Sequence, residues 1–593
     1  MNLQSIADRL YETDVLVVGG GTAGCPAAWK AAKNGLDVIM IEKNHTARSG
    51  HCAQGIDTNL NFPRPGVPLK LHVADWQKRH HMFYGEGKFC DPNIGWVTFE
   101  KAYWALKQME DMGCEMRWEK GPDGKVLFIP NMFFGGDENQ IAVHWRNIKR
   151  DMYNACLKAG VKVLNRIMLI DLLTENGRVI GATCYDTREG SFIVIMAKVV
   201  IMAAGPLART YDSETPMFYK YKYRYHGAPG ALSGDGLAAA YRAGAELVNM
   251  DIGNCWFYRL RDDILMPIGQ VFHRDGVNGR WTDYEGNQYP PIATARLYAE
   301  LEEAGKTPVF LSQTHLNEDY QKRIEVATAD ERMVSLKLSE DRGFNPAEHR
   351  YEIQPMHLHN FATACGIVVD ETFESNTLKG LFAVGDIAAA LSSCGPAVTS
   401  GMIVGEAMPE YIKNAHLDKQ GNVDMNQITA AKAIVDRYAS TPDGCNPIEL
   451  EASVRYISTV YISQYKQANK LKVGQQRLNS LRREFYDNMD GSNPHHLMRC
   501  LETRNIMDMQ QVHIDACFSR PETRGNYTWQ GTWERDPARD DMLTYQRMEN
   551  GKPVLEIRHV PELKEKYVNS PDDAEIECAD LYWDELKKES ERK

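Results

Sequence analysis

The sequence predicts an α/β fold: a Rossmann-like domain interrupted by an inserted α+β capping domain and followed by a helical C-terminal domain. A strand, a glycine-rich turn, a helix and a second strand follow one another within residues 14–44. Strand-and-glycine patterns return at residues 198–206 and 366–390, on either side of a region rich in aromatic residues, arginines and loops. From residue 426 to residue 511 the chain is rich in helix formers. Strands that alternate with helices favour a parallel sheet.

The first unit of this pattern is a strand–helix–strand segment. Val15–Val18 is a short apolar, β-branched run, and Val38–Ile41 is a second one. Such runs are typical of buried strands. Ala23–Asn34 between them has a helical composition, and Gly35 is a suitable C-cap. The order strand, turn, helix, strand predicts a βαβ unit.

The turn of this unit has the chemistry needed to bind an adenine dinucleotide. Gly19, Gly21 and Gly24 have the spacing G-x-G-x-x-G. In such a turn the first glycine permits a tight bend, the second lets the backbone approach a diphosphate, and the third packs the helix on the strand. The diphosphate would lie at the helix N-terminus, where free N–H groups favour an anion. Glu42 follows the second strand and can accept hydrogen bonds from ribose hydroxyls. NAD and FAD satisfy this unit equally well.

Composition excludes several classes of protein. A chain of 593 residues is too long for one compact core, so several domains are expected. A formal net charge of −12 disfavours broad nucleic-acid binding. No apolar run reaches the length of a membrane span and no signal peptide is recognisable, so we expect a cytoplasmic protein whose association with a membrane would be indirect. The thirteen cysteines contain no C-x-x-C pair, which disfavours a disulfide scaffold, a zinc site or an iron–sulfur cluster held within this chain.

Later segments predict further walls of the same site. The glycine-punctuated segment Ala47–Asn61 is either a loop beside the cofactor or a surface loop after the βαβ unit. Lys198–Pro206 is a buried strand with a glycine turn, which either returns the chain to the cofactor or is only a core strand. Asp386 follows the strand Leu381–Val384 and either bonds a sugar or ribityl hydroxyl or caps the next helix. The start of a helix within Thr399–Met408 could face the cofactor.

These patterns predict domain boundaries. The Rossmann-like domain is expected to comprise residues 1–230 and 362–415, with the capping and substrate domain at 231–361 between them. Residues 416–549 would form the helical C-terminal domain. Residues 550–593 would form a charged tail that wraps a partner or remains mobile.

Five segments, taken in order, resemble the flavoprotein subunit of the succinate dehydrogenase/fumarate reductase superfamily. They are GGGTAG with Glu42, SGHCAQG, SGDGLAAAYRAGAE, GLFAVGDIAAA and RPETRGNY. Within the superfamily, the segments Ser49–Gly55 and Met266–Gly269 are most similar to the α subunit of dissimilatory adenylylsulfate reductase. The resemblance implies FAD as the cofactor and a small ferredoxin-like partner that carries the iron–sulfur clusters. The absence of cluster ligands in this chain agrees with that division.

The resemblance also implies that FAD is bound without a covalent link. Ser49 stands where succinate dehydrogenases have the histidine that links the flavin, and His51 is out of register. His51 is then a polar neighbour of the flavin ring. The residues expected to bind FAD are Gly19, Gly21, Thr22, Ala23, Gly24, Glu42, Lys43, Ser49, Gly50, Gln54, Gly55, Ala204, Gly205, Asp235, Gly385, Asp386, Ser400 and Gly401.

Arg296 is the first catalytic candidate. Its segment ARLYAELEEAGKTPVF is similar to the one whose arginine protonates the substrate in fumarate reductases. An arginine has a high pKa, so Arg296 could instead be a fixed positive clamp on an anionic substrate, or only a helix-surface partner of Glu300.

Two other groups are catalytic candidates. His359 lies near the position of the family's substrate-binding histidine, and His357 competes with it for that role. A histidine there could orient the substrate or donate a proton near neutral pH, although a histidine in a loop is more often structural. Arg259 and Arg261 follow Trp256 in a charged and aromatic segment. That segment suits an anionic or heterocyclic ligand and equally suits packing between domains.

One departure from the family limits the choice of substrate. Fumarate reductases have an arginine for the second carboxylate in a segment that corresponds to Ser392–Met402 here, which contains no arginine or histidine. A dicarboxylate would lose a charge-assisted contact of about 1.5–3 kcal/mol. The adenylylsulfate-reductase pattern at this place is also reduced, to Ser400–Gly401.

We therefore expect an FAD-dependent, adenylylsulfate reductase α-like subunit. It would pass electrons between an iron–sulfur partner and a small anionic substrate. One alternative is a fumarate reductase-like enzyme that reduces an activated C=C bond in a non-dicarboxylate acid. Another is a flavin electron-transfer subunit without its own substrate. A flavin-dependent RNA-modifying protein fits the acidic composition poorly.

Overall fold

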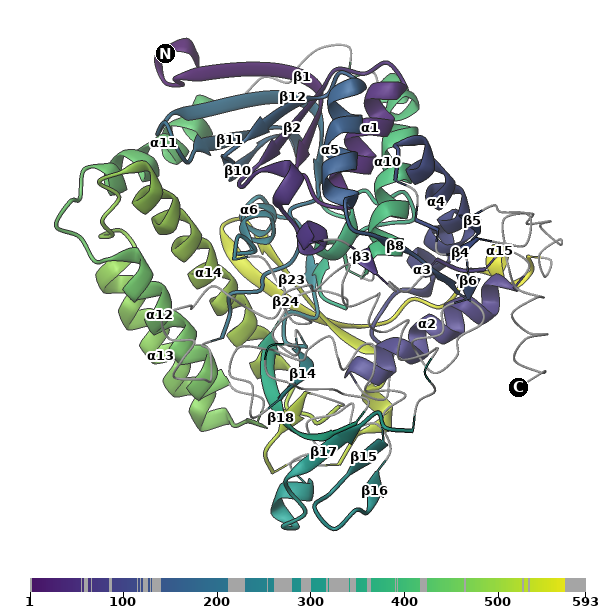
Figure 1. Cartoon of the computed structure of the whole chain (residues 1–593). Helices are drawn as coiled ribbons and strands as arrows, with labels where there is room; N and C mark the ends of the chain where they lie inside the picture. The colour runs from purple at the N-terminus through teal and green to yellow at the C-terminus, as the bar shows by residue number, and fades with distance from the viewer. Residues whose placement is uncertain are drawn as a thin grey trace.

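The computed structural model of the protein confirms the predicted fold class (Figure 1). The structure describes residues 3–54, 56–57, 62–64, 67–84, 88–114, 116–117, 119–120, 126–127, 129–130, 140–211, 230–252, 254–260, 280–289, 300–315, 318, 341, 348–359, 364–389, 391, 393–415, 417, 424–462, 465–524, 527–531 and 534–570. In this part of the chain, no helix is long and apolar enough to cross a membrane.

A seven-stranded sheet forms the centre of the Rossmann-like part. Its order is β10-β11-β12-β1-β2-β9, and β20 also pairs with β12. Strands β1, β2, β9, β12 and β20 run parallel to their neighbours in that set, whereas β10 and β11 form an antiparallel extension. The strands are β1 (Arg9–Val18), β2 (Val38–Glu42), β9 (Lys162–Asn165), β10 (Ile167–Glu175), β11 (Arg178–Asp186), β12 (Phe192–Met202) and β20 (Leu381–Ala383).

The apolar runs of the central parallel strands are buried on both faces, which their sequences predict, whereas the edge strand β9 is not buried. All five residues of β2 and the last four of β1 are buried. Because β1, β2, β12 and β20 are parallel, their carboxyl ends meet at one edge of the sheet. The segments that follow these strands therefore converge there.

Helices α1 (Gly24–Lys33), α5 (Ile148–Lys158) and α10 (Cys394–Asn414) lie together beside this sheet (Figure 1). Two glycines of α10 let it approach α1 closely. A Cβ at Gly401 would lie 2.2 Å from the carbonyl oxygen of Ala23, and one at Gly405 would lie 2.5 Å from that of Ala27. Both distances are far below van der Waals contact, so only glycine fits this crossing.

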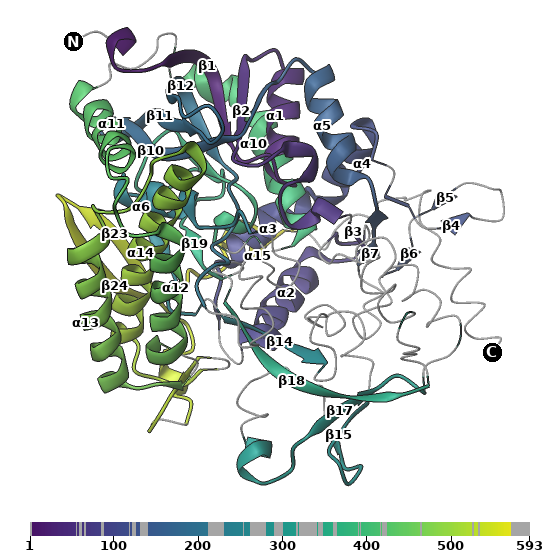
Figure 2. The same cartoon turned by 60° about the vertical axis from the view of Figure 1, so that its left-hand side comes forward.

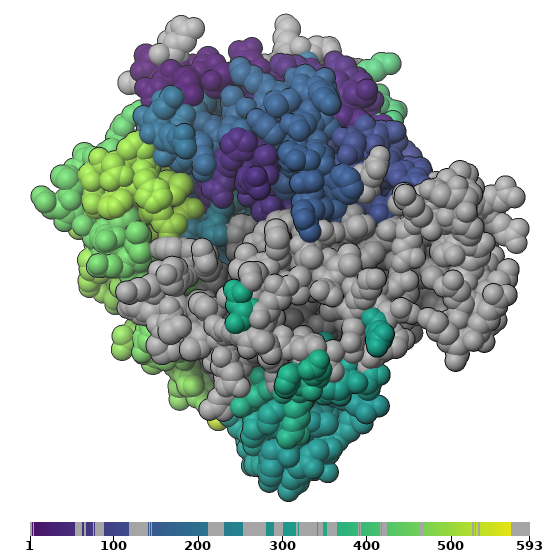
Figure 3. Space-filling view, viewed as in Figure 1, coloured from purple at the N-terminus to yellow at the C-terminus, as the bar shows by residue number. Residues whose placement is uncertain are grey.

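The inserted domain contains an antiparallel five-stranded sheet of order β14-β18-β17-β15-β16. Its strands are β14 (Asn254–Leu260), β15 (Arg280–Thr282), β16 (Gln288–Tyr289), β17 (Val309–Ser312) and β18 (Arg350–His359). This sheet lies at the end of the molecule away from β1 and β2, and its teal residues form that end in the space-filling view (Figures 1 and 3).

The C-terminal part is mainly helical up to residue 519, with the short strand β21 (Tyr465–Lys466) between two of its helices. Helices α12, α13 and α14 pack side by side along one flank of the molecule (Figure 2). The helices and the π-helix are α11 (Met425–Ala439), α12 (Pro447–Ile457), η7 (Ser458–Ile462), α13 (Ala468–Phe485) and α14 (Pro494–Ser519). Helix α14 is buried along most of its length, including several charged residues.

The expected tail boundary at residue 550 needs correction. Strands β23 (Met542–Glu549) and β24 (Lys552–His559) form a hairpin whose turn contains residue 550. Through β23 the hairpin joins β13 (Leu247–Val248) and β19 (Gly366–Ile367) in a four-stranded sheet. Residues 552–559 include several charged residues, so their sequence did not indicate a strand. Most positions of this strand are exposed. Residues 571–593 lie outside the described residues.

The expected boundary at residue 231 also falls too early. Helix α6 (Asp235–Arg242) packs on β10 of the seven-stranded sheet. Arg242 holds it there, because its Nε donates to Asp171 at 2.6 Å and its Nη2 donates to the carbonyl of Ile170 at 3.0 Å. The inserted part of the chain therefore begins after α6.

Short elements complete the described chain. The helices among them are η1 (Leu3–Ser5), η2 (Thr46–Arg48), η3 (His51–Gln54), α2 (Leu69–Tyr84), α3 (Pro92–Glu100), α4 (Ala102–Asp111), η6 (Gly385–Ile387), η8 (Pro537–Arg539) and α15 (Glu565–Val568). The strands are β3 (Ile56–Asp57), β4 (Glu119–Lys120), β5 (Val126–Leu127), β6 (Ile129–Pro130), β7 (Ile141–Ala142), β8 (His144–Trp145), β21 (Tyr465–Lys466) and β22 (Thr528–Trp529).

Candidate functional site

A pocket opens where the parallel strands end, and segments that are far apart in sequence line it. Its non-atom space is about 860 Å³, including the part open to solvent. The pocket is lined by Val18, Gly19, Gly21, Thr22, Ala23, Ile41, Glu42, Lys43, Ser49, Gly50, His51, Ile167, Leu169, Ala203, Ala204, Gly205, Pro206, Ala231, Leu232, Asp235, Val384, Gly385, Asp386 and Ala397.

The glycine turn between β1 and α1 forms the floor of this pocket. Gly19 has a φ of +103°, and a Cβ there would lie 2.4 Å from the carbonyl oxygen of Ala203. A Cβ at Gly24 would lie 1.8 Å from the carbonyl oxygen of Gly19. At Gly21, by contrast, a Cβ would meet no protein atom within 4 Å. Gly19 and Gly24 therefore serve the fold, whereas Gly21 leaves room for a ligand.

Glu42 is fixed at the end of β2 by two backbone donors. The N–H of Gly20 donates to Oε2 at 2.9 Å, and the N–H of Asn44 donates to Oε1 at 2.8 Å. The carboxylate is buried and lines the pocket. Each carboxylate oxygen can accept more than one hydrogen bond, so Glu42 retains acceptor capacity for a ribose hydroxyl.

On the other side of the glycine turn, η3 contacts η6. Nδ1 of His51 lies 3.2 Å from Oδ2 of Asp386. Two polar atoms beside this contact are buried and have no hydrogen-bond partner in the described structure: Oγ of Ser49 and Oδ1 of Asp386. A buried polar atom without a partner costs free energy, so a ligand that supplies hydrogen-bond donors and acceptors fits this place.

Lys43 and Asp235 connect the pocket to a buried network of charges. Nζ of Lys43 donates to Oγ of Ser233 at 2.6 Å, to Oδ2 of Asp235 at 2.6 Å and to Oε1 of Glu502 at 2.7 Å. Burial alone would lower the pKa of Lys43, but Asp235 and Glu502 outweigh it and raise that pKa. Lys43 is therefore held as a cation at the pocket wall.

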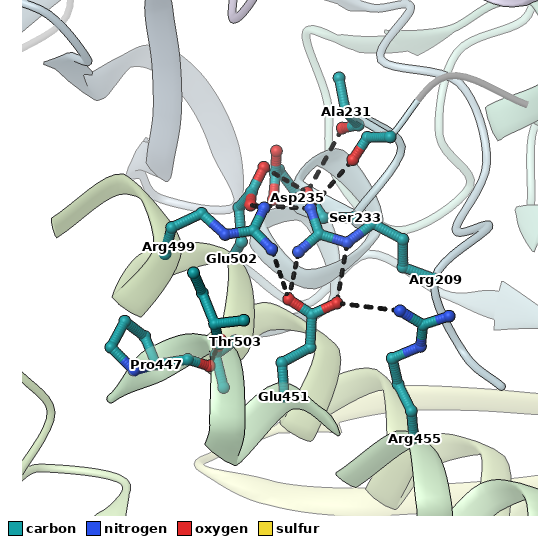
Figure 4. Close-up of polar contacts among 12 residues, drawn as sticks. Arg209, Ala231, Ser233, Asp235, Pro447, Glu451, Arg455, Arg499, Glu502 and Thr503 are labelled. Atoms are coloured by element: carbon teal, nitrogen blue, oxygen red, sulfur yellow. Dashed lines mark hydrogen bonds and ion pairs between the residues drawn. The ribbon is translucent and has the colours of Figure 1, made fainter. Parts of the chain in front are cut away.

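The network continues into the helical domain (Figure 4). Arg209 donates to both oxygens of Glu451 and, at 2.7 Å, to Oε2 of Glu502. Arg499 donates to Oε2 of Glu451 at 2.8 Å and also contacts Glu502. Burial would raise the pKa of the Glu451 carboxyl, but Arg209 and Arg499 hold it below its usual value. Both glutamates are thus charged inside the protein.

The structure brings most predicted cofactor residues together. Those that line the pocket are Gly19, Gly21, Thr22, Ala23, Glu42, Lys43, Ser49, Gly50, Ala204, Gly205, Asp235, Gly385 and Asp386. Gly24, Ser400 and Gly401 lie outside the pocket lining and pack behind it. Ser400 accepts from the N–H of Gly385 at 3.1 Å, so it supports the lining. Gln54 ends η3, and Gly55 lies outside the described residues.

Sequence reasoning missed the apolar walls of the pocket. Ile167 and Leu169 stand on β10, and Leu232 precedes α6. Their composition is that of any buried segment, so no sequence signal distinguishes them from ordinary core residues.

The catalytic candidates that the structure describes lie in the inserted domain. Arg259 is on β14 and His357 and His359 are on β18, and these two strands are paired. In the ladder, Arg259 pairs with Gln354 and His359 pairs with Asn254. Arg259 and His359 are thus five ladder positions apart, roughly 17 Å at about 3.4 Å per residue. Arg261, Arg296 and the segment Met266–Gly269 lie outside the described residues. Among the described residues, no cluster of three His, Cys, Asp or Glu side chains could hold a metal ion.

A glycine turn at a helix N-terminus, an acid after the second strand and a second half built from β12 and β20 define a dinucleotide-binding α/β protein. Residues 14–258 match the family model described as the FAD binding domain. The chain is therefore an FAD-dependent oxidoreductase, and the predicted FAD cofactor and its non-covalent binding are confirmed.

Comparisons with known proteins over nearly the whole chain agree with this assignment. The CoM/CoB fumarate reductase of Methanothermobacter marburgensis contains a subunit that is 22% identical over 88% of this chain and 94% of its own. Adenylylsulfate reductase from Archaeoglobus fulgidus superposes with a TM-score of 0.78 at 20% identity, covering 95% of this chain and 97% of its own. E. coli quinol fumarate reductase superposes with a TM-score of 0.72 at 19% identity, covering 96% and 99%. The fold is that of the flavoprotein subunits of the succinate dehydrogenase/fumarate reductase superfamily.

Proposed function

We propose that this protein is an adenylylsulfate reductase α-like subunit that passes electrons between an iron–sulfur partner and a small anionic substrate. When bound, FAD supplies the two-electron redox chemistry, and the protein supplies binding, orientation and electrostatics. The pocket described above would hold the cofactor. The inserted domain, with Arg259, Arg261, Arg296 and His359, would bind the substrate.

The pairing of β14 with β18 carries this proposal. It brings a cationic and aromatic segment onto the same sheet as His357 and His359. Arginines recognise carboxylate, sulfate and phosphate groups through paired N–H donors, so this sheet suits an anion.

The buried start of α10 weighs against a dicarboxylate. Residues 394–402 are all buried, and none of them carries a positive charge. Fumarate reductases place the arginine for a second carboxylate in the segment similar to this one. The higher TM-score with adenylylsulfate reductase, 0.78 against 0.72 with E. coli quinol fumarate reductase, supports the same choice at the level of fold.

A second candidate is a reductase of an activated C=C bond in a non-dicarboxylate acid. The retained Arg296 favours it, because an arginine at this place could act on such a bond. A candidate of another class is a flavin electron-transfer subunit without its own substrate. In that case the arginines of the inserted domain would contribute only packing.

Reoxidation of the chemically reduced flavin separates the three candidates. The purified protein is bleached with a stoichiometric amount of dithionite and then offered adenylylsulfate, fumarate or monocarboxylic enoates. AMP and sulfite, the reverse pair, are offered to the oxidised flavin instead. The proposal expects turnover with the adenylylsulfate pair. Turnover with an enoate alone supports the second candidate, and reoxidation by none of them supports the third.

Arg296→Gln tests the assigned residue, and Arg280→Gln is its control. Arg280 is exposed on β15 of the same inserted sheet. We expect Arg296→Gln to lose at least a hundredfold in turnover, while Arg280→Gln keeps the wild-type turnover. Bleaching of the flavin by dithionite should be unchanged in both variants. Full turnover in Arg296→Gln would refute its catalytic role. Iron analysis of the co-purifying small protein tests the partner, and a partner without iron–sulfur clusters would contradict the proposal.

A further inference from the structure

We propose that His51, held by Asp386, exchanges a proton in step with the redox state of FAD. Nδ1 of His51 lies 3.2 Å from Oδ2 of Asp386, and both residues line the cofactor pocket. They come from separate elements, η3 and η6, so the fold itself brings them together. The imidazole is about one-third exposed, which leaves it open to exchange protons with solvent.

The two carboxylate oxygens of Asp386 have different surroundings. Oδ2 contacts the imidazole, whereas Oδ1 is buried and has no hydrogen-bond partner in the described structure. Oδ1 therefore suits a hydroxyl donor of the bound cofactor. The ionised carboxylate accepts from Nδ1–H of His51, which fixes the ring and leaves Nε2 as the atom that gains or loses a proton.

The coupling follows from charge balance. Two electrons taken from a reductant add two negative charges to the cofactor, and a proton bound by the flavin ring cancels only one. An imidazole that lines the same pocket is then more easily protonated, because an opposite charge nearby favours its charged form. Nε2 would bind one proton from solvent as the flavin is reduced and release it when the flavin is oxidised.

Other charged and titratable groups stand on the elements next to His51, and several of them have hydrogen-bond partners of their own. Lys149 on α5 donates to the carbonyl of Gly20, and Asp151 on α5 accepts from Trp145 at 2.7 Å. The remaining groups on adjoining elements are His45, Arg48, Cys52 and Cys394. His45 accepts from the N–H of Ala47. A hydrogen bond with Cys52, together with burial, keeps the pKa of the Cys394 thiol well above its usual value. These six groups lie outside the pocket lining, whereas His51 is part of it.

The midpoint potential of the bound flavin tests the proposal between pH 5.5 and 8. For a two-electron couple, each additional proton makes the potential steeper by 29.6 mV per pH unit. Over part of this range we expect the wild-type slope to exceed that of His51→Gln by up to this amount. His51→Lys keeps a positive charge beside Asp386 without titrating near neutral pH, so its slope should match that of His51→Gln at a higher potential.

His496→Gln is the matched control. His496 and Asp490 form a similar pair in the helical domain, with 3.1 Å between Nδ1 and Oδ2 and comparable exposure, but they do not line the pocket. This variant should keep the wild-type slope. A wild-type slope in both His51 variants would overturn the proposal, and so would an equal loss in His496→Gln.

A second measurement applies if the His51 variants release FAD. In wild-type enzyme labelled with 13C-histidine, one imidazole, absent from the spectrum of His51→Gln, should titrate at least one pH unit higher after anaerobic reduction. Identical histidine titrations in the oxidised and reduced enzyme would overturn the proposal. The proposal rests on bound FAD and not on the substrate, so the outcome of the turnover assays leaves it intact.

Discussion

Arg209 and Glu451 form a two-point ion pair in which both side chains are only 1% exposed. Arg209 follows β12 of the Rossmann-like part, and Glu451 stands on α12 of the helical domain (Figure 4). Arg499 and Glu502 on α14 complete the cluster, and Glu502 also binds Lys43 at the pocket. One network of charges thus joins the helical domain to the wall of the cofactor site.

Glu451→Gln should destabilise the junction strongly. Removing this carboxylate leaves Arg209 and Arg499 buried without one of their two anionic partners. Loss of one partner of a buried ion pair costs about 3–5 kcal/mol in free energy of unfolding. Urea unfolding followed by circular dichroism measures the change. Asp487→Asn is the control, because the Arg437–Asp487 pair is exposed and should contribute less than about 1 kcal/mol. Equal effects of the two substitutions would contradict a structural role for the buried network.

Gly21→Ala and Gly401→Ala should separate cofactor binding from folding. A Cβ at Gly21 meets no protein atom within 4 Å and extends into the pocket region, so the apoprotein should keep its stability. Crowding a packed FAD costs about 1–3 kcal/mol, which is roughly a five- to 150-fold rise in Kd. Gly401→Ala places a methyl group 2.2 Å from the carbonyl oxygen of Ala23 and should destabilise the apoprotein itself. Fluorescence titration with FAD and thermal unfolding measure the two effects. Unchanged FAD affinity in Gly21→Ala would contradict the binding of the diphosphate at this turn.

The sequence predicted the parts of the fold that local patterns determine. Apolar runs of four residues marked β1, β2 and β20, and the glycine spacing marked the turn before α1. The predicted domain boundaries differ from the structure where contacts between distant segments determine which domain a segment joins. Residues 552–559 are charged and largely exposed, yet pairing with β23 makes them a strand. Helix α6 belongs with the seven-stranded sheet because Arg242 binds Asp171 on β10, and no local pattern encodes that contact.

The candidate site shows the same division. Gly21 was predicted from the glycine spacing and Glu42 from its position after the second strand, and both line the pocket. Lys43 and Asp235 line it as well, but their engagement with Glu502 depends on the docking of α14, which sequence spacing does not reveal. The contact between His51 and Asp386 joins residues 335 positions apart, so only the fold could show it.

Ser49→Ala should change apoprotein stability and FAD affinity in opposite directions. Oγ of Ser49 is buried without a hydrogen-bond partner in the described structure, and this residue lines the pocket. Removing the hydroxyl should stabilise the apoprotein by about 1 kcal/mol and weaken FAD binding by a similar amount. Thr399→Val is the control, because Oγ1 of Thr399 is likewise buried and unpartnered but the residue lies outside the pocket lining. That variant should gain stability without losing affinity. Parallel behaviour of the two variants would mean that Ser49 does not contact the cofactor.

His513 predicts how stability depends on pH. This imidazole is buried on α14, where Nδ1 lies 2.6 Å from the carbonyl oxygen of Met250 and Nε2 lies 2.9 Å from the hydroxyl of Tyr211. Burial, aided by the charge of Lys466, lowers the pKa of His513 from 6.5 to about 3. The ring therefore stays neutral in the folded protein at pH values where it is protonated in the unfolded chain.

The sign of the effect follows from proton binding. Between pH 6.5 and pH 3 the unfolded chain holds one more proton at His513 than the folded protein does, so stability falls as the pH falls through this window. The stabilising contribution is fully present above pH 6.5. Between pH 7 and pH 5.5, above the range where carboxylates dominate, this residue should account for a loss of about 1 kcal/mol in the free energy of unfolding. Urea unfolding at both pH values measures it. His513→Gln should be less stable than wild type at pH 7 but should lose about 1 kcal/mol less on acidification. His496→Gln, altered at a half-buried histidine, should keep the wild-type dependence. If His513→Gln kept that dependence too, another buried base would have to be responsible.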